Sequence, residues 1–351
     1  MGLKPLEALK KNPARLPARQ ETHAMPNPPV FLCPGQGAQT VGMGKAWFDF
    51  SNNAARTFGA ADDIIAPLLG EKLSTLCFEG PPERLNRTDV AQPALYVTAI
   101  ASFQVDFANL DAASFFATAG LSLGEYTALY LARAITFQDG LELVALRGRA
   151  MQDAADASDS GMVALVGADE QSAQAVCEDA LKTCGPDAVL VPANFNAPGQ
   201  IVISGSKDAC DAALHAAKEA SLRATPLPVA GAFHSPIMQP AAERLRAALA
   251  KTDIQTPVCP VISNVTARPH GEPADGVPEG PDGIRELLVR QLTSPVRWDE
   301  SCRWLSQHAN EQDPNAEFHE LAPGKVLSGL MRRIDRQRKV TNHDAPSHAQ
   351  A

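Results

Sequence analysis

The sequence predicts an α/β fold in which one large domain carries a smaller inserted domain. Two short apolar runs, at residues 30–33 and 115–119, each end in a glycine-containing turn, and we expect a helix after each turn. Strand, tight turn and helix in this order are typical of α/β folds. Between residues 159 and 229 the predicted order becomes β-α-β-β-α-β, which is the split βαβ arrangement of a ferredoxin-like unit.

The large domain is predicted to occupy residues 29–158 and 230–336. Its first part holds both apolar strands and helices at 125–134 and 141–151. Its second part begins with a helix at 236–249 and a strand at 258–263. A Pro/Gly-rich loop at 269–283 follows, and helical segments then extend to residue 334.

The inserted domain is predicted to span residues 159–229. We expect strands at 162–166, 188–193, 200–204 and 223–229, and helices at 169–182 and 207–220. The turn APG at 197–199 separates the second strand from the third.

The two ends of the chain lack such patterns. Residues 1–28 are rich in Pro, Lys and Arg and have no apolar run of the kind found in a secretory signal, which predicts a disordered extension. Residues 337–351 are polar and predict a flexible tail.

Composition argues against several classes of function. The chain has 351 residues, of which 45% are hydrophobic, so it can bury a sizeable core. A net charge of -9 argues against binding to nucleic acid, and no apolar run is long enough to cross a membrane. The 7 cysteines show no metal-binding spacing, so we expect no metal site and a cytoplasmic protein with reduced thiols.

The sequence GLSLG at residues 120–124 has the form of a nucleophile elbow in its usual setting between strand and helix. The flanking glycines allow a sharp turn, and the helix N-terminus favours a developing negative charge. This context indicates that Ser122 can be acylated. A serine that only caps the helix is the alternative that the motif alone leaves open.

His234 is the best candidate for the base that a serine nucleophile needs. It follows a predicted strand and precedes Ser235 and Pro236, which resemble a helix N-cap and first helical residue. A helix N-terminus lowers the pKa of an imidazole and keeps it neutral, although a buried structural histidine is the alternative. No acidic residue is evident as a third member, so either a hidden acid or a backbone carbonyl orients the ring. The other histidines lie in the predicted tails (His23, His343, His348), in the Pro/Gly-rich loop (His270) or in polar or helical surroundings (His215, His308, His319).

Two further features bear on the site. The sequence PGQGAQ at 34–39 fails the pattern of a nucleotide-binding loop, but its backbone N–H groups could line an oxyanion pocket. Arg147 rises from the apolar face of the predicted helix at 141–151, where a guanidinium can hold a substrate carboxylate through two hydrogen bonds. The alternative is an arginine whose stem covers the core while its head reaches water.

Together these residues resemble the malonyl-CoA:acyl carrier protein transacylase family. The resemblance covers about residues 30–334 and rests on seven motifs in the order typical of the family. They are PGQGAQ at 34–39, SLGEY at 122–126, LRGR at 146–149, NFNAPGQ at 194–200, AFHS at 232–235, VRQL at 289–292 and GKVL at 324–327.

The resemblance implies an α/β-hydrolase-like large subdomain, a ferredoxin-like small subdomain, and transfer of a malonyl group between two thiols in fatty-acid biosynthesis. It implies that Ser122 is the nucleophile, His234 the base and Arg147 the clamp for the free carboxylate of the malonyl group.

The resemblance also implies supporting roles. The backbone N–H groups of Gln36 and Leu123 would form the oxyanion hole. The carbonyl of Gln291 would orient the base, and Asn196 would border the substrate cleft. Leu121 is a departure, because the family usually has histidine directly before the nucleophile.

The implied substrates are malonyl-CoA, a coenzyme A thioester, and phosphopantetheinylated acyl carrier protein, with no metal or other cofactor. We expect a monomer that binds neither nucleic acid nor membrane. A stand-alone acyltransferase for a polyketide synthase and an acyl-thioester hydrolase remain alternatives.

Overall fold

The structure is a computed structural model that describes residues 27–346. Its large subdomain is built around a five-stranded parallel sheet with the order β7-β2-β1-β8-β9. Every residue of the central strand β1 is buried, as expected for a parallel sheet covered on both faces. The strands are β1 (Pro29–Cys33), β2 (Ala117–Gly120), β7 (Val261–Ile262), β8 (Glu317–Glu320) and β9 (Val340–Asn342).

Helices cover both faces of this sheet. One group comprises α1 (Lys45–Phe50), α2 (Asn52–Leu69), α3 (Leu73–Glu79), α4 (Pro82–Leu85), α5 (Thr88–Asp106), α6 (Gly124–Leu131), α7 (Phe137–Asp156), α10 (Gln239–Leu249) and α11 (Gly280–Arg290). The other group comprises α12 (Trp298–Gln312) and α13 (Val326–Ile334). Two short 3-10 turns, η1 (Ala112–Ser114) and η2 (Pro236–Met238), complete the subdomain.

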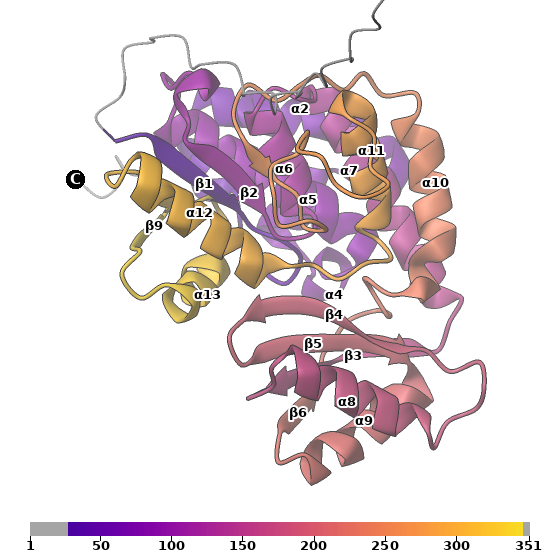
Figure 1. Ribbon diagram of the computed structural model, residues 1–351. Coiled ribbons are helices and arrows are strands. Elements are labelled where there is room, and N and C mark those ends of the chain that lie inside the picture. The colour runs from indigo at the N-terminus through magenta and orange to yellow at the C-terminus, as the bar shows by residue number, and fades with distance from the viewer. Residues whose placement is uncertain (1–26, 347–351) are drawn as a thin grey trace, which may run out of the picture.

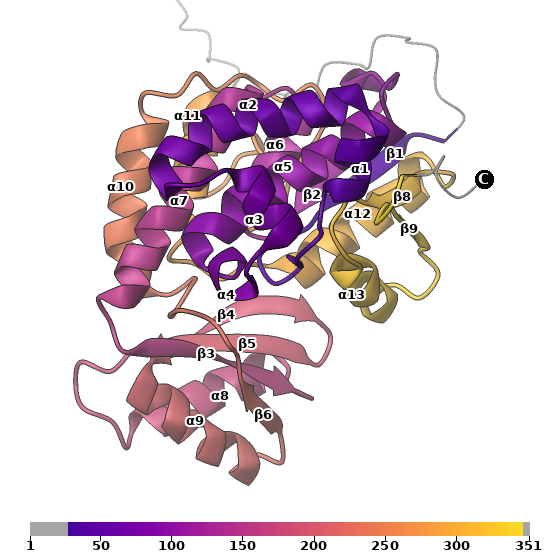
Figure 2. The same ribbon diagram turned by 180° about the vertical axis from the view of Figure 1, so that it is seen from behind.

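The alternating side chains of β1 divide the interior into two cores. Phe31 and Cys33 join the core of the larger helix group, whereas Val30 and Leu32 pack with α12 and α13. Figure 1 shows α12 and α13 in front of the sheet, and Figure 2 shows α2 and α3 on the opposite side.

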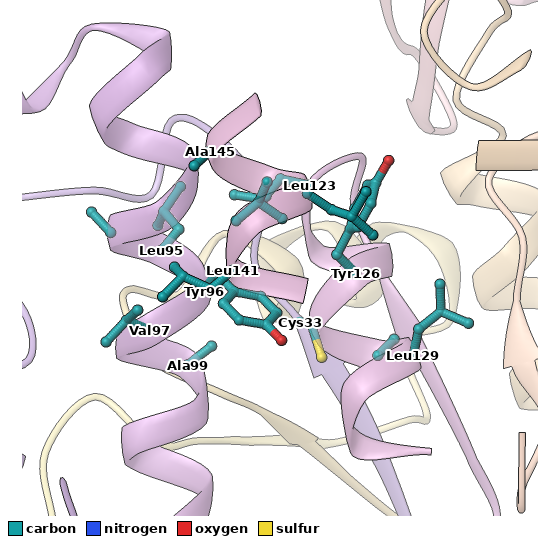
Figure 3. Packing of buried hydrophobic residues seen from close by; sticks show 14 of the residues in the cluster. Cys33, Leu95, Tyr96, Val97, Ala99, Leu123, Tyr126, Leu129, Leu141 and Ala145 are labelled. Atoms are coloured by element: carbon teal, nitrogen blue, oxygen red, sulfur yellow. The ribbon is translucent and has the colours of Figure 1, made fainter. Parts of the chain in front are cut away.

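Close packing of α5, α6 and α7 positions the segments from which the site is built. Buried side chains of these helices meet beside Cys33 at the end of β1, among them Tyr96 and Leu141 (Figure 3). Gly148 lies against the backbone of α5, where an added Cβ would come within 2.6 Å of the Thr88 carbonyl oxygen. The glycine therefore allows the close approach of α7 to α5, and Arg147 is its neighbour in the sequence.

The small subdomain is an antiparallel sheet with the order β4-β5-β3-β6 and two helices whose buried side chains share one core. Its elements are β3 (Ser160–Val166), α8 (Glu170–Leu181), β4 (Leu190–Ala197), β5 (Gln200–Ser206), α9 (Lys207–Glu219) and β6 (Arg223–Pro226). The predicted fold class, an α/β large subdomain with an inserted ferredoxin-like unit, is confirmed. The domain boundaries at residues 158 and 229 stay predictions.

Strand β4 of the small subdomain forms backbone hydrogen bonds with the large subdomain. The Phe195 N–H donates to the Val296 carbonyl at 2.9 Å, and the Val296 N–H donates to the Ala193 carbonyl at 2.8 Å. These bonds hold the small subdomain against the segment that leads into α12.

The structure corrects the prediction of a flexible tail from residue 337. Strand β9 pairs in parallel with β8, and the following His343 is 7% exposed and hydrogen-bonded through Nδ1 to Asp106 Oδ2 at 2.8 Å. A three-residue strand has too little sequence to show periodicity, and its partners lie far away along the chain.

Other differences are smaller. The predicted strand at 258–263 is reduced to β7, and β8 interrupts the predicted helical stretch before residue 334. Of the predicted disordered extension at 1–28, residues 1–26 lie outside the described part. Asn27 and Pro28 both form hydrogen bonds with Glu317 of β8, so these two residues of the predicted extension are held against the sheet. Within residues 27–346 no helix is long and apolar enough to cross a membrane.

Candidate active site

Ser122 lies in a sharp turn between β2 and α6, with a φ of 52°. The turn depends on both flanking glycines. A Cβ on Gly120 would lie 1.9 Å from the carbonyl carbon of Gly124, and a Cβ on Gly124 would lie 2.2 Å from the Cys33 carbonyl oxygen. The local sequence therefore permits a left-handed backbone at the serine, which is the geometry of a nucleophile elbow.

Ser122 Oγ lies 2.9 Å from His234 Nε2, and His234 Nδ1 lies 2.7 Å from the main-chain oxygen of Gln291. A carbonyl oxygen can only accept, so Nδ1 carries the proton and Nε2 is free to accept the hydroxyl proton of the serine. The arrangement can therefore activate the Ser122 hydroxyl as a nucleophile. The partner of Nδ1 is a backbone carbonyl, which is one of the two possibilities that the sequence left open.

His234 is 4% exposed and also has a positive φ, at 59°. Burial first, and then the charge of Arg147, lower the pKa of His234 to about 4. The direction of this shift was predicted, but the expected cause was a helix N-terminus. Burial disfavours the charged ring, so the imidazole is neutral near pH 7 and able to accept a proton.

Arg147 of α7 is 1% exposed, and burial lowers the pKa of its guanidinium. Its Nη1 donates to Gln92 Oε1 at 2.7 Å, and its Nη2 donates to Gln291 Oε1 at 2.8 Å and to Ser122 Oγ at 3.0 Å. Its Nε has no partner within residues 27–346.

No carboxylate forms an ion pair with Arg147 among the described residues. All three of its hydrogen-bond partners are neutral groups. A buried cation that no carboxylate contacts is costly, and this one lies beside the nucleophile. The site can therefore take up an anionic group next to Ser122, and the geometry does not fit an arginine that merely extends its head into water.

Two backbone donors stand near the nucleophile without acceptors. Within the described part of the chain, neither the Gln36 N–H nor the Leu123 N–H donates to any protein group. Gly35 packs directly on the loop before Ser122, because a Cβ there would lie 2.3 Å from the Leu121 carbonyl oxygen. This contact brings the loop after β1 to the elbow, as an oxyanion pocket requires.

A cleft of about 470 Å³ opens over Ser122 between the two subdomains. The large subdomain contributes mainly polar groups together with Leu121, Met151 and the ring of Phe233, and the small subdomain contributes a mainly apolar wall with two amides. The lining includes Gln36, Gln92, Leu121, Ser122, Arg147, Phe233 and His234 from the large subdomain, and Met162, Asn194, Asn196 and Val202 from the small subdomain. Asn196 thus lines the cleft together with Gln36, Ser122, Arg147 and His234, whereas Leu123 and Gln291 lie behind its lining. The Asn196 Oδ1 is buried with no partner among residues 27–346.

Several residues of the site were missed by the sequence analysis. Asn264 Oδ1 accepts from the Ser122 N–H at 2.6 Å, and Asn264 Nδ2 donates to the Gly120 carbonyl at 2.7 Å. Glu125 and His270 form a buried pair beneath the elbow, 2.7 Å apart. His270 was assigned only to a Pro/Gly-rich loop, and nothing in that loop indicated a buried partner. Gln92 lies within the almost wholly buried helix α5, and the apolar residues around it in the sequence indicate only a core helix.

No group of three or more His, Cys, Asp or Glu residues within the described range is arranged to hold a metal ion. All 7 cysteines carry free thiols.

The chain matches the family model of the acyl transferase domain over residues 30–338. It is 42% identical over 312 residues to a malonyl CoA-acyl carrier protein transacylase of Bacillus subtilis (strain 168), with 89% of this chain and 92% of that protein covered.

Solved structures agree. The malonyl CoA-acyl carrier protein transacylase of Coxiella burnetii superposes with a TM-score of 0.81 at 35% identity, covering 93% of this chain and 96% of that chain. A malonyl-transacylase in complex with a type II polyketide synthase acyl-carrier protein superposes with a TM-score of 0.80 at 34% identity, covering 91% of this chain and 96% of that chain.

Proposed function

The chain belongs to the acyl transferase family, and we propose from this premise that it moves a malonyl group from malonyl-CoA to the phosphopantetheine thiol of acyl carrier protein. The intermediate is a malonyl ester on Ser122. Arg147 is the observation that carries the proposal, because it is a buried cation without an ionic partner, 3.0 Å from Ser122 Oγ. Malonyl is an acyl group that ends in a carboxylate, and a guanidinium binds a carboxylate through two parallel hydrogen bonds.

In the first half-reaction, Ser122 Oγ attacks the thioester carbonyl while its proton passes to His234 Nε2. The Gln36 and Leu123 N–H groups stabilise the tetrahedral oxyanion. The carbon–sulfur bond then breaks, and the imidazolium returns the proton to the departing coenzyme A sulfur. The main-chain carbonyl of Gln291 holds the ring in the required tautomer throughout.

In the second half-reaction, the phosphopantetheine thiol gives its proton to His234, and the resulting thiolate attacks the ester carbonyl. The ester bond to Ser122 breaks, and the serine oxygen recovers the proton from the imidazolium. The product is a malonyl thioester of the carrier protein, and no net proton is gained or lost.

Arg147 also influences the base. Its charge is the second cause of the low pKa of His234, after burial. When a malonyl carboxylate pairs with the guanidinium, part of that repulsion is removed, and the imidazole accepts the serine proton more readily. A substrate with the carboxylate therefore favours both its own binding and the chemical step.

The relatives are named as malonyl transacylases of acyl carrier protein, which supports transfer over hydrolysis. The protein is an acyltransferase, and the comparisons favour neither an enzyme dedicated to a polyketide synthase nor an acyl-thioester hydrolase. The proposal includes the roles of the site residues and a place in fatty-acid biosynthesis in the cytoplasm. It also includes a monomeric state and no cofactor beyond the two substrates, malonyl-CoA and phosphopantetheinylated acyl carrier protein.

The transfer step has a direct test. The protein is mixed with malonyl-CoA and excess acyl carrier protein, in the phosphopantetheinylated form or in the unmodified form, and the intact mass of the carrier is measured. We expect one malonyl group on the phosphopantetheinylated carrier only. If free malonate is released and neither form of the carrier gains the mass of a malonyl group, the protein is a hydrolase instead.

A further inference from the structure

Glu125 is a fully buried acidic residue three positions after the nucleophile, and the mechanism above gives it no task. It is 0% exposed at the start of α6. Its Oε1 accepts from His270 Nε2 at 2.7 Å, and its Oε2 accepts from Gln291 Nε2 at 2.7 Å and from the Asn264 N–H at 3.0 Å. One carboxylate therefore joins α6, the loop after β7 and the end of α11.

Both neighbours of this carboxylate on the Oε2 side hold the backbone of Ser122. Asn264 Oδ1 accepts from the Ser122 N–H at 2.6 Å, and Gln291 Nε2 donates to the Ser122 carbonyl at 2.9 Å. The left-handed conformation of the serine is thus supported from both sides by groups that Glu125 orients.

The carboxylate also decides which way the Gln291 amide faces. Two acceptors, the Glu125 carboxylate and the Ser122 carbonyl, surround its Nε2. Its Oε1 is thereby turned toward Arg147 Nη2, which can only donate, at 2.8 Å. A reversed amide would place an NH₂ group against the guanidinium and lose all three bonds.

We propose that Glu125 is a positioning residue, which fixes the Gln291 amide and through it aims Arg147 at the carboxylate of the acyl group. This inference rests on the proposed function, since it assigns Arg147 the malonyl carboxylate. It extends that function by connecting substrate selection to a buried hydrogen-bond acceptor that contacts no substrate.

His270 makes a conservative replacement of Glu125 feasible. Its Nδ1 has no partner in the described part of the chain, so the ring can carry its proton on either nitrogen. In Glu125→Gln, the amide oxygen can keep the bonds to Gln291 and Asn264, and the new NH₂ can donate to His270 Nε2 after the ring changes tautomer. In Glu125→Met these acceptors are lost, so the Asn264 N–H and one hydrogen of the Gln291 amide have no partner, and on its NH₂ side that amide keeps only the Ser122 carbonyl.

The test compares kcat/KM for malonyl-CoA and acetyl-CoA, together with the melting temperature, in Glu125→Gln and Glu125→Met. Glu320 provides a matched control, because it is also 0% exposed and its carboxylate accepts from the N–H groups of Leu327 and Ser328, away from the cleft. We expect Glu125→Met to reduce the malonyl-to-acetyl ratio at least about tenfold, equivalent to about 1.4 kcal/mol, and Glu125→Gln to restore it. Glu320→Met should lower the melting temperature and keep the ratio.

If Glu125→Met lowers kcat/KM for malonyl-CoA and for acetyl-CoA by the same factor, so that their ratio stays that of the wild type, the proposal is overturned. If Glu125→Met does not fold, Gln291→Met answers the same question, since it removes the amide but keeps the main-chain carbonyl for His234. An unchanged ratio in Gln291→Met would leave Glu125 nothing to act through and would also overturn it. Failure of the proposed function has a different signature, because the wild-type protein would then transfer no malonyl group to the carrier protein.

Discussion

Replacement of Arg147 separates substrate choice from the chemistry of acyl transfer. The guanidinium is 1% exposed, and all of its hydrogen-bond partners are neutral. No carboxylate of the described residues forms an ion pair with it, so a malonyl carboxylate bound in the cleft would supply that ion pair. We expect Arg147→Ala to impair transfer from malonyl-CoA strongly. Transfer from acetyl-CoA should hold steady or rise, because acetyl has no carboxylate that needs a cation.

The magnitude follows from the burial of the pair. Truncating one partner of a buried, hydrogen-bonded charge pair costs about 2 to 5 kcal/mol. At about 1.4 kcal/mol per factor of ten, kcat/KM for malonyl-CoA should fall roughly 30-fold to several thousandfold. Arg147→Lys keeps the charge but loses the planar fork, so its loss should be intermediate.

The assay is steady-state transfer to acyl carrier protein with each thioester in turn. Arg149→Ala is the matched control, because Arg149 lies on the same helix but its side chain is 58% exposed and pairs with Asp153 at 2.9 Å. This control should behave like the wild type. Equal losses for malonyl and acetyl in Arg147→Ala, together with a lower melting temperature, would refute the reasoning and make Arg147 a structural residue.

Three further predictions concern other parts of the molecule. Leu121→His should change the transfer rate only modestly, because Ser122 and His234 are unaffected; an inactive wild type that gains activity in Leu121→His would show that the leucine marks a degenerate enzyme. The profile of kcat/KM against pH reports the free enzyme, so it should stay level as the pH falls from neutrality and decline only through about 4, where His234 becomes protonated. A decline centred near 6.5 would show that the ring is not held neutral by burial. Deletion of residues 340–351 removes β9 and the buried hydrogen bond of His343, and should lower the melting temperature by at least about 2 °C. An unchanged melting temperature would show that this segment does not contribute to stability.

The sequence predicted those parts of the fold that local patterns determine. The β-α-β-β-α-β order of the small subdomain was evident because each element has several residues of its own periodicity. Strands β7, β8 and β9 have two, four and three residues, and they exist only because longer strands nearby offer hydrogen-bond partners. Such elements are defined by tertiary pairing, which a single sequence does not display.

The same distinction applies to the site. Ser122 could be predicted because its glycines and helix are adjacent in the sequence, and His234 because its neighbours set it apart from the other histidines. The hydrogen-bonded residues that hold these two in place could not be predicted. Glu125 and His270 are 145 residues apart, and Gln291 is 169 residues from the serine carbonyl that it holds. Only the assembled fold brings these groups together.

The central claim is that the acyl group is carried as an ester on Ser122, and one measurement tests it most directly. Wild-type protein and Ser122→Ala are each mixed with malonyl-CoA in the absence of carrier protein, and the intact mass of each is recorded, followed by mapping of any modified peptide. The account predicts one added malonyl group on the wild type, located at Ser122, and none on the variant. A wild type that stays unmodified, or a malonyl group that persists on Ser122→Ala, would contradict it.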